Sequence, residues 1–211
     1  MLNIITKNIL AAAVAALLSA TLIAQEKPGV QIPASRRDRW QKPVEVINSM
    51  NLKPGQVVVD IGAGDGYFTR RFAVAVAPDG KAIGVDISPR SIRSLMADAK
   101  RLGLDNYEAR LVPPDDPMLA PQSVDAIFLC DTYHEMEDRV EYFRRVRQAL
   151  KLGGKLFVID SVKTRQRDKH AIEKEVVTEE LKQAGYNLVR EFDFLLSRQF
   201  FVEFEPAAAK Q

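Results

Sequence analysis

The stretch at residues 57–73, VVVDIGAGDGYFTRRFA, constrains the fold of this chain more than any other part of the sequence. It begins with three β-branched valines and shows no polar alternation, which is typical of a parallel strand covered on both faces. Gly62, Gly64 and Gly66 follow, and glycines allow unusual backbone angles and let a ligand approach the main chain. The amphipathic run at 67–76 then predicts a helix whose unpaired N–H groups point back at the turn. Together these features predict a nucleotide or cofactor pocket.

The spacing of these glycines distinguishes between ligands. The order is G-x-G-x-G with Asp60 two residues before the first glycine, whereas a dinucleotide-binding turn has the spacing G-x-G-x-x-G. Residues 60–66, DIGAGDG, resemble motif I of the class I, seven-strand S-adenosylmethionine-dependent methyltransferases. The resemblance implies S-adenosylmethionine as cofactor, with its methionine part against Gly62, Gly64 and Gly66 and its ammonium oriented by Asp60, directly or through water. A glycine loop without a ligand is the alternative.

A second acid agrees with this resemblance. The predicted strand 81–86 ends in Asp86, about 20 residues past the glycine turn, where a carboxylate is placed to accept hydrogen bonds from both ribose hydroxyls. The stretch GVDIS resembles motif II of the same family, which implies that Asp86 binds the ribose. The alternative is that Asp86 only accompanies the start of the next helix, which Ser88 and Pro89 are able to cap.

The loop after the third predicted strand, 107–112, carries the next family position. Its sequence is PPDDP, in the region where the family contacts adenine with a side chain and a backbone amide. Proline has no N–H, so the amide must come from Asp115 or Asp116. The loop departs from the family's usual Gly-Asp-Ala pattern and leaves the adenine contact open between these two residues, with a plain turn as the alternative for each.

A buried strand predicted at 124–130 is followed by DTYHEM, at the edge of the sheet where ligands bind. The segment corresponds to motif IV of the family, beside the transferable methyl group. It lacks the two prolines carried by methylases of nucleic-acid amino groups and protein glutamine, which argues against those acceptors. Asp131 is expected to touch the cofactor or the acceptor, and Tyr133 to line the acceptor site. His134 is the candidate general base, since its reference pKa is about 6.5; a structural hydrogen-bonding role is the alternative.

The sequence predicts no metal site. The stretch HEMED lacks the second histidine of the zinc-protease pattern H-E-x-x-H, and Cys130 is the only cysteine, so no cysteine pair exists to bind zinc. We interpret Cys130 as a buried strand residue rather than as a thiol that binds a metalloid.

The order of elements predicts a doubly wound α/β fold with a mostly parallel seven-stranded sheet, helices on both faces and a C-terminal antiparallel hairpin. The last feature is typical of these methyltransferases and is not expected of a dinucleotide dehydrogenase. The methyltransferase domain is predicted over 35–206, with a tail at 207–211. Helices are predicted at 35–50, 67–76, 91–102, 137–151 and 170–184, the fifth strand after the glycine turn at 152–154, and the hairpin strands at 187–194 and 199–204.

Residues 1–24 predict a signal peptide or a membrane anchor, and 25–34 a linker. Lys7 precedes an uncharged run rich in alanine and leucine with small residues near its end. We expect the domain to be periplasmic or secreted. The alternative is a membrane-anchored domain in the cytoplasm, because arginines at 36, 37 and 39 follow a run only a little short of the roughly 20 residues that span a bilayer.

The charges are balanced, with 30 basic and 28 acidic residues and a net charge of +2. This balance gives no electrostatic argument for a nucleic-acid or anionic-membrane partner and leaves a small, nearly neutral ligand open. We predict a small-molecule methyl acceptor and no nucleic-acid partner. The predicted activity is in-line methyl transfer, with an oxygen, nitrogen or carbon acceptor left open. Two alternatives are a non-catalytic domain that retains the S-adenosylmethionine-binding fold, and a nicotinamide-dependent oxidoreductase. The oligomeric state is not predicted.

Overall fold

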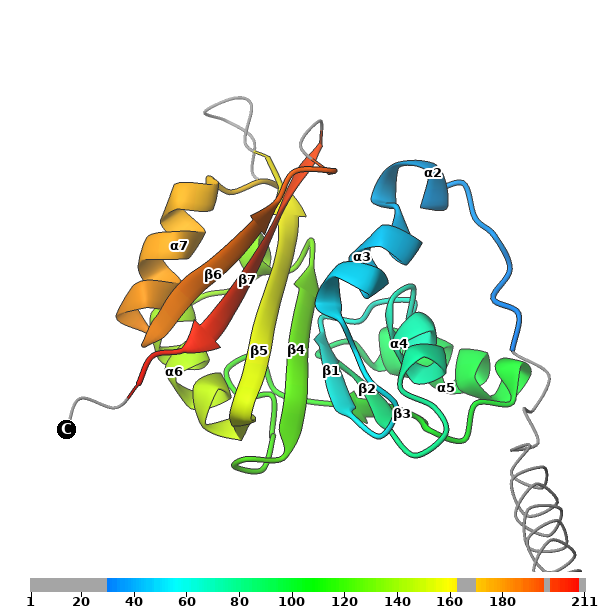
Figure 1. The fold of residues 1–211 in the computed structure, drawn as a ribbon. Helices are drawn as coiled ribbons and strands as arrows, with labels where there is room; N and C mark the ends of the chain where they lie inside the picture. Colours follow the sequence, from blue (N-terminus) through cyan, green and yellow to red (C-terminus); the bar gives the residue numbers. More distant parts are fainter. Residues whose placement is uncertain (1–29, 163–169, 196–197, 209–211) are drawn as a thin grey trace, which may run out of the picture. The chain divides into compact units, whose positions relative to one another are not determined.

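One mixed sheet of seven strands forms the centre of the chain in the computed structural model (Figure 1). The strands are β1 Val57–Ile61, β2 Lys81–Asp86, β3 Tyr107–Leu111, β4 Val124–Cys130, β5 Leu150–Ser161, β6 Tyr186–Phe192 and β7 Gln199–Pro206. Their order across the sheet is β3-β2-β1-β4-β5-β7-β6. The first five strands pair in parallel, and β7 is antiparallel to both β5 and β6. The predicted seven-stranded fold with a C-terminal antiparallel hairpin is therefore confirmed.

The sheet is built outward from β1 in both directions. The chain runs from β1 outward through β2 and β3, and then returns to place β4 on the other side of β1. Val59 consequently lies between Ile83 and Ile127 in the register of the three central strands. The strand order reverses at this point, and open α/β sheets bind ligands in the crevice that such a reversal leaves at the carboxyl ends of the strands.

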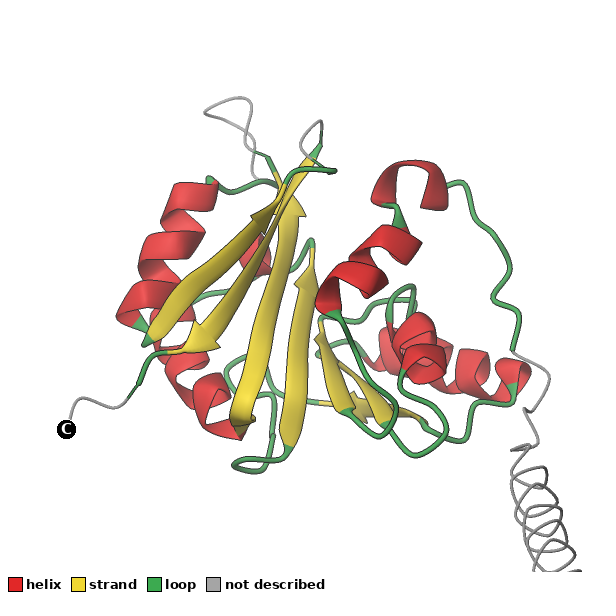
Figure 2. Cartoon of the chain, in the orientation of Figure 1, coloured by secondary structure: helices red, strands yellow, loops and turns green. Residues whose placement is uncertain are grey.

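Helices cover both faces of the sheet, as the ribbon coloured by secondary structure shows (Figure 2). They are α2 Asp38–Gln41, α3 Pro43–Met50, α4 Thr69–Ala75, α5 Pro89–Leu102, the short 3₁₀ helix η1 Tyr133–Glu135, α6 Arg139–Ala149 and α7 Lys174–Gln183. Helices α4 and α5 pack against β1, β2 and β3, with α3 against α4. Helices α6 and α7 pack against each other and against β5 and β6.

Aromatic side chains fill the space under these helices. Phe68 and Phe72 pack on Phe128 of β4 with ring centroids 4.7 and 5.0 Å apart. On the α6 side, the stacked rings of Tyr133 and Phe143 have centroids 5.1 Å apart. All five rings are 2% exposed or less, and burying an aromatic side chain of this kind contributes roughly 1.5–3 kcal/mol to stability.

Several predicted boundaries differ from the structure, and three of these differences have a clear local reason. The helix predicted at 170–184 begins only at Lys174, because the buried Ile172 bridges to Val162 and its N–H donates to Ser161. The glycine turn at 152–154 lies inside β5, where the register to β4 shifts as at a bulge. The segment 35–50 forms two helices, because Lys42 takes a left-handed conformation before Pro43, and the residue before a proline avoids the helical region.

The structure describes residues 30–162, 170–195 and 198–208. The predicted leader at 1–24 and half of the linker, residues 25–29, lie outside them, as does most of the tail. The sheet and the helices named above belong to one compact unit, residues 32–211. Across the described ranges, no helix has both the length and the apolar character needed to cross a bilayer.

Candidate cofactor and active site

A cavity of about 910 Å³ lies at the carboxyl ends of β1, β2 and β4, and we call it the edge cavity. Its wall includes residues that end or follow these strands, among them Gly62, Gly64, Asp86, Asp131 and Thr132. The cavity therefore occupies the crevice at which the strand order reverses.

The three glycines of the turn after β1 have different surroundings. All three have positive φ angles, 71° for Gly62, 56° for Gly64 and 76° for Gly66, which glycine adopts readily. A Cβ on Gly64 would meet nothing within 4 Å, and this residue lines the edge cavity. A Cβ on Gly62 would overlap the side chain of Thr132, and one on Gly66 would overlap the hydroxyl of Tyr107. At Gly64, therefore, a ligand can reach the main chain. At Gly66 a glycine is required because any side chain would overlap Tyr107.

Asp86 lies where the sequence predicts it, on the wall of the edge cavity at the end of β2. Its carboxylate accepts the N–H of Gly64 at 2.9 Å and the N–H of Ser88 at 2.8 Å. These two bonds fix the carboxylate against the glycine turn, and a carboxylate has about four acceptor positions in all. Asp86 can therefore accept two further hydrogen bonds from a ligand.

The two acids of the proline-rich loop differ in position. Asp115 lines the edge cavity, whereas Asp116 accepts the N–H of Met118 at 2.7 Å and is not part of the wall. A side chain that accepts a backbone N–H two residues ahead is a common way to hold a turn. The structure therefore favours Asp115 for a ligand contact and gives Asp116 the turn role.

Asp60 does not reach the edge cavity. Its side chain is 4% exposed and accepts the hydroxyl of Thr69 at 2.6 Å, within the first turn of α4. We therefore revise the interpretation of Asp60 as a direct ligand and assign it the role of holding α4 against β1. Burial raises the pKa of Asp60 from 3.8 to about 7, against the opposing effects of the Thr69 hydrogen bond and the Arg37 charge.

This pKa predicts how Asp60 affects stability. An acid with a raised pKa in the folded state contributes stability that is present below about pH 4 and is lost as the pH rises through 7. In Asp60→Asn, we expect urea denaturation to show a shallower fall in the free energy of unfolding between pH 4 and 7. The slope changes by up to about 1.4 kcal/mol per pH unit. Asp105→Asn, at an exposed position, is the control, and parallel curves for Asp60→Asn and wild type would contradict the assignment.

Tyr133 is also buried away from the cavity. Its side chain is 0% exposed and its hydroxyl donates to Glu180 at 2.9 Å, while Arg139 makes a bidentate ion pair with the same carboxylate. The geometry of η1 turns the ring toward Phe143 of α6 instead of toward the ligand edge. This corrects the expectation that Tyr133 lines an acceptor site, and its role is to pack α6 and α7 against η1.

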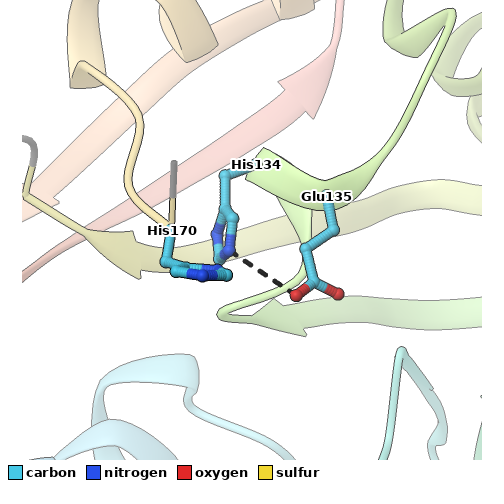
Figure 3. A group of neighbouring side chains, drawn as sticks. All are labelled: His134, Glu135 and His170. Atoms are coloured by element: carbon cyan, nitrogen blue, oxygen red, sulfur yellow. Dashed lines mark ion pairs between the residues drawn. The ribbon is translucent and has the colours of Figure 1, made fainter. Parts of the chain in front are cut away.

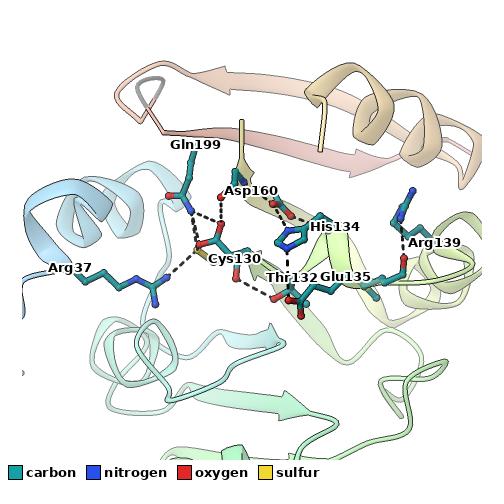
Figure 4. Close-up of polar contacts among 11 residues, drawn as sticks. Arg37, Cys130, Thr132, His134, Glu135, Arg139, Asp160 and Gln199 are labelled. Atoms are coloured by element: carbon teal, nitrogen blue, oxygen red, sulfur yellow. Dashed lines mark hydrogen bonds and ion pairs between the residues drawn. The ribbon is translucent and has the colours of Figure 1, made fainter. Parts of the chain in front are cut away.

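His134 is fixed by a buried acid of β5 (Figure 4). Its Nδ1 lies 2.7 Å from Asp160 Oδ1, and its backbone N–H donates to the other oxygen at 3.1 Å. A carboxylate only accepts, so Nδ1 carries the proton and Nε2 is the basic nitrogen. Burial raises the pKa of Asp160, and the histidine opposes this shift. The imidazole is not part of the wall of the edge cavity. Its Nε2 lies 3.8 Å from the carboxylate of Glu135, and Glu135 does belong to that wall.

Asp131 lies at the end of a partly buried chain of hydrogen bonds that includes Gln199. Its carboxylate accepts the amide of Gln199 at 2.7 and 2.8 Å and the hydroxyl of Ser161 at 2.9 Å. The Gln41 amide donates to Gln199 at 2.6 Å, and Arg37 donates to Gln41 at 3.1 Å. Helix α2 is thereby connected to the wall of the edge cavity, where Asp131 belongs as predicted.

Sequence reasoning missed several of these residues. Asp160 carries a readable signal, because it is an acid near the end of a strand on the ligand side of the sheet. Gln41 and Gln199 carry none, since they lie 158 positions apart and only the fold brings them together. Cys130 ends β4, as the interpretation as a strand residue requires, but it is half-buried and not fully buried. It receives a contact from Arg37 at 3.3 Å, and desolvation raises its pKa well above the usual range.

The fold and the edge cavity define the class of this protein. It is a doubly wound α/β domain with its ligand crevice at the point where the strand order reverses, framed by a glycine turn and an acid that ends the neighbouring strand. A family model described as a methyltransferase domain matches residues 52–193. This match covers more than half of the chain, so the chain belongs to this methyltransferase family, whose cofactor is S-adenosylmethionine.

Curated relatives agree with the family. Phosphoethanolamine N-methyltransferase 1 of Arabidopsis thaliana is 31% identical over 149 residues, which are 68% of this chain and 28% of that protein. Arsenite methyltransferase of Halobacterium salinarum is 28% identical over 113 residues, 54% of this chain and 29% of that protein. The matched part of the chain thus spans less than a third of the length of these two relatives.

Solved structures agree with the fold. A SAM-dependent methyltransferase from Aquifex aeolicus superimposes with a TM-score of 0.75 at 24% identity, over 81% of this chain and 93% of that one. The methyltransferase CalH in complex with SAH has a TM-score of 0.64 at 22% identity, over 77% of this chain and 55% of that one. The expectation of a class I methyltransferase fold is confirmed.

Proposed function

We propose that this domain transfers a methyl group from S-adenosylmethionine to a small acceptor molecule that is uncharged or cationic. The observation that carries the proposal is the arrangement of Asp86 beside Gly64 on the wall of the edge cavity. It offers an oriented carboxylate for ribose hydroxyls and an open stretch of main chain for the rest of the cofactor.

The described residues fit this cofactor. Asp86 has acceptor positions to spare for two ribose hydroxyls, and no Cβ at Gly64 stands in the way of a ligand. Asp115 also lines the cavity, which supports it as the residue that contacts the adenine amino group. Bound S-adenosylmethionine supplies a methyl carbon activated by the adjacent sulfonium. The protein has to align the acceptor with that carbon and exclude water.

The charge of the cavity wall narrows the acceptor. Arg145 is the one basic side chain among the described wall residues, against seven carboxylates. The carboxylates belong to Asp86, Asp115, Asp131, Glu135, Glu137, Asp138 and Glu141. Such a wall attracts a sulfonium and a cationic or neutral acceptor, and it repels the pyrophosphate of a nicotinamide cofactor. Relatives named for phosphoethanolamine and arsenite support an acceptor of small size only, because phosphoethanolamine carries an anionic phosphate and does not share the charge proposed here.

Asp131 and Thr132 directly follow β4 and are the first residues of motif IV, and both line the edge cavity. Asp131 is held by Gln199 and Ser161, so it presents a fixed acceptor to a hydroxyl or amine of the acceptor molecule. The proposed transfer does not depend on His134 as general base, because Glu135 and not the imidazole contributes to the wall. A base is needed only for an acceptor that is protonated at the working pH.

Isothermal titration of the full chain with S-adenosylhomocysteine and with NADH tests the cofactor. We expect binding of the first at micromolar concentration and none of the second. Binding of NADH alone would overturn the proposal in favour of the oxidoreductase. Formation of S-adenosylhomocysteine from S-adenosylmethionine with a panel of small amines and phenols then tests transfer; cofactor binding without any transfer favours the non-catalytic alternative.

Export or membrane anchoring through residues 1–24 is a further proposal, and it is based on the sequence alone. Its support is the uncharged run after Lys7 and the abrupt change in composition at 25–29. Mass spectrometry of the N-terminus of the expressed protein distinguishes cleavage after residue 20 or 24 from an uncleaved anchor.

A further inference from the structure

Two adjacent residues, His134 and Glu135, meet His170 from a distant part of the chain (Figure 3). One nitrogen or oxygen atom from each of His134, Glu135 and His170 lies within 4.8 Å of the other two. The imidazole planes of His134 and His170 are nearly perpendicular, at 85°, with ring centroids 6.2 Å apart. His134 Nε2 faces the carboxylate of Glu135 at 3.8 Å.

The environment of His134 is that of a prepared metal ligand. Its side chain is 6% exposed, and Asp160, which holds its Nδ1, is 0% exposed. A carboxylate on the second ring nitrogen fixes the tautomer, makes the first nitrogen more basic and orients it, and metal-binding histidines almost always have such a partner. Nε2, the atom so prepared, is the one that points toward Glu135 and into the cluster with His170.

We propose that His134 Nε2, Glu135 and His170 bind a first-row divalent metal ion, such as Zn²⁺. Two imidazoles and one carboxylate suit such an ion, whereas Mg²⁺ and Ca²⁺ prefer oxygen ligands alone. The proposal departs from the expectation of no metal site. The histidine that HEMED lacks is supplied by a residue 36 positions further along the chain, between β5 and α7.

The required movement is small. Ligand atoms around a tetrahedral zinc ion lie roughly 3.3 Å apart, since each bond is about 2.0–2.2 Å long. The ligand atoms lie within 4.8 Å of one another, so the exposed side chains of Glu135 and His170 have to approach by about 1.5 Å or less while His134 stays in place. Three protein ligands leave at least one coordination position for water. Glu135 is shared with the wall of the edge cavity, so the ion lies at its border.

The experiment uses the full chain without an affinity tag, treated with a chelator and then dialysed against Zn²⁺. We expect one zinc ion per chain, and X-ray absorption with nitrogen and oxygen ligands at about 2.0–2.2 Å. His170→Ala and Glu135→Gln are each expected to weaken zinc binding by about 10-fold or more, since even outer-shell partners contribute that much. Glu137→Gln, on the cavity wall but outside the cluster, is the matched control and should bind zinc like the wild type.

Absence of stoichiometric zinc in the wild type would overturn the proposal. So would zinc binding that neither His170→Ala nor Glu135→Gln weakens relative to Glu137→Gln. Circular dichroism of each variant separates loss of a ligand from loss of folding, and exposed positions such as His170 and Glu135 are tolerant of change. The metal measurements use no cofactor, so their outcome is independent of whether the domain binds S-adenosylhomocysteine.

Discussion

Replacing Asp86 by alanine is expected to weaken the binding of S-adenosylhomocysteine by about 100-fold, or roughly 2.7 kcal/mol. Hydrogen bonds to a charged group contribute about 1.5–3 kcal/mol each, and the proposed ribose contact has two of them. The variant also removes the acceptor of the Gly64 N–H, which loosens the turn that the cofactor lies against. Isothermal titration of both proteins at one salt concentration measures the difference.

Asp105→Ala is the matched control for this experiment. It removes the same charge from an exposed turn after α5, outside the edge cavity. We expect its dissociation constant to stay within about twofold of the wild type, because an exposed charge at a distance is screened by salt. Equal binding by Asp86→Ala and Asp105→Ala would remove Asp86 from the cofactor site and leave it the role of fixing the glycine turn.

Gly66→Ala is expected to destabilise the fold by about 3 kcal/mol or more. The new Cβ would overlap the hydroxyl of Tyr107 and lie 2.8 Å from Leu95, both buried in the α5 side of the core. Overpacking of a core costs about 1–3 kcal/mol, and the positive φ of 76° adds about 1–2 kcal/mol for a residue with a side chain. Urea denaturation measures the loss of stability.

Gly64→Ala separates packing from ligand binding at the same turn. Its φ is also positive, at 56°, but the added Cβ meets no atom within 4 Å. We expect a loss of stability of only about 1 kcal/mol, together with weaker binding of S-adenosylhomocysteine, because the methyl group occupies the approach to the main chain. Equal losses of stability in the two variants would show that backbone strain alone, and not the contact with Tyr107, decides the choice of glycine.

Local sequence patterns predict the bounds of the strands that carry the site. They are less successful in predicting whether a side chain on these strands points to the ligand or to the core. The strands at 81–86 and 124–130 have the bounds that the sequence indicates, because apolar runs between turn residues define them sharply. Asp86 follows from its place at the end of such a strand. Asp60, in the neighbouring strand, is expected at the ligand because of the resemblance to motif I, and only its burial and its hydrogen bond with Thr69 show that it faces the core.

The side-chain directions of the residues after β4 are difficult to predict for a different reason. A short 3₁₀ helix at η1 sends Tyr133 into the core and Glu135 to the cavity, and no periodicity in so short a segment predicts these directions. His134 and His170 are 36 positions apart, and the bridge between Ile172 and Val162, just after β5, holds the chain next to His170 in place. Sequence patterns therefore identify the candidates in motif IV, and the fold decides which of them reach the ligand.

The hydrogen-bond chain from Arg37 through Gln41 and Gln199 to Asp131 joins two segments that both lie outside the family match at 52–193. The shared unit supplies the glycine turn and Asp86, whereas the flanking segments orient the acid on the other side of the cavity. We therefore expect exchange of the two flanks to change the orientation of Asp131 while the glycine turn and Asp86 stay in place. Chimeras that graft residues 32–50 and 198–208 onto a related domain test this expectation, by comparing cofactor binding with transfer to a panel of acceptors.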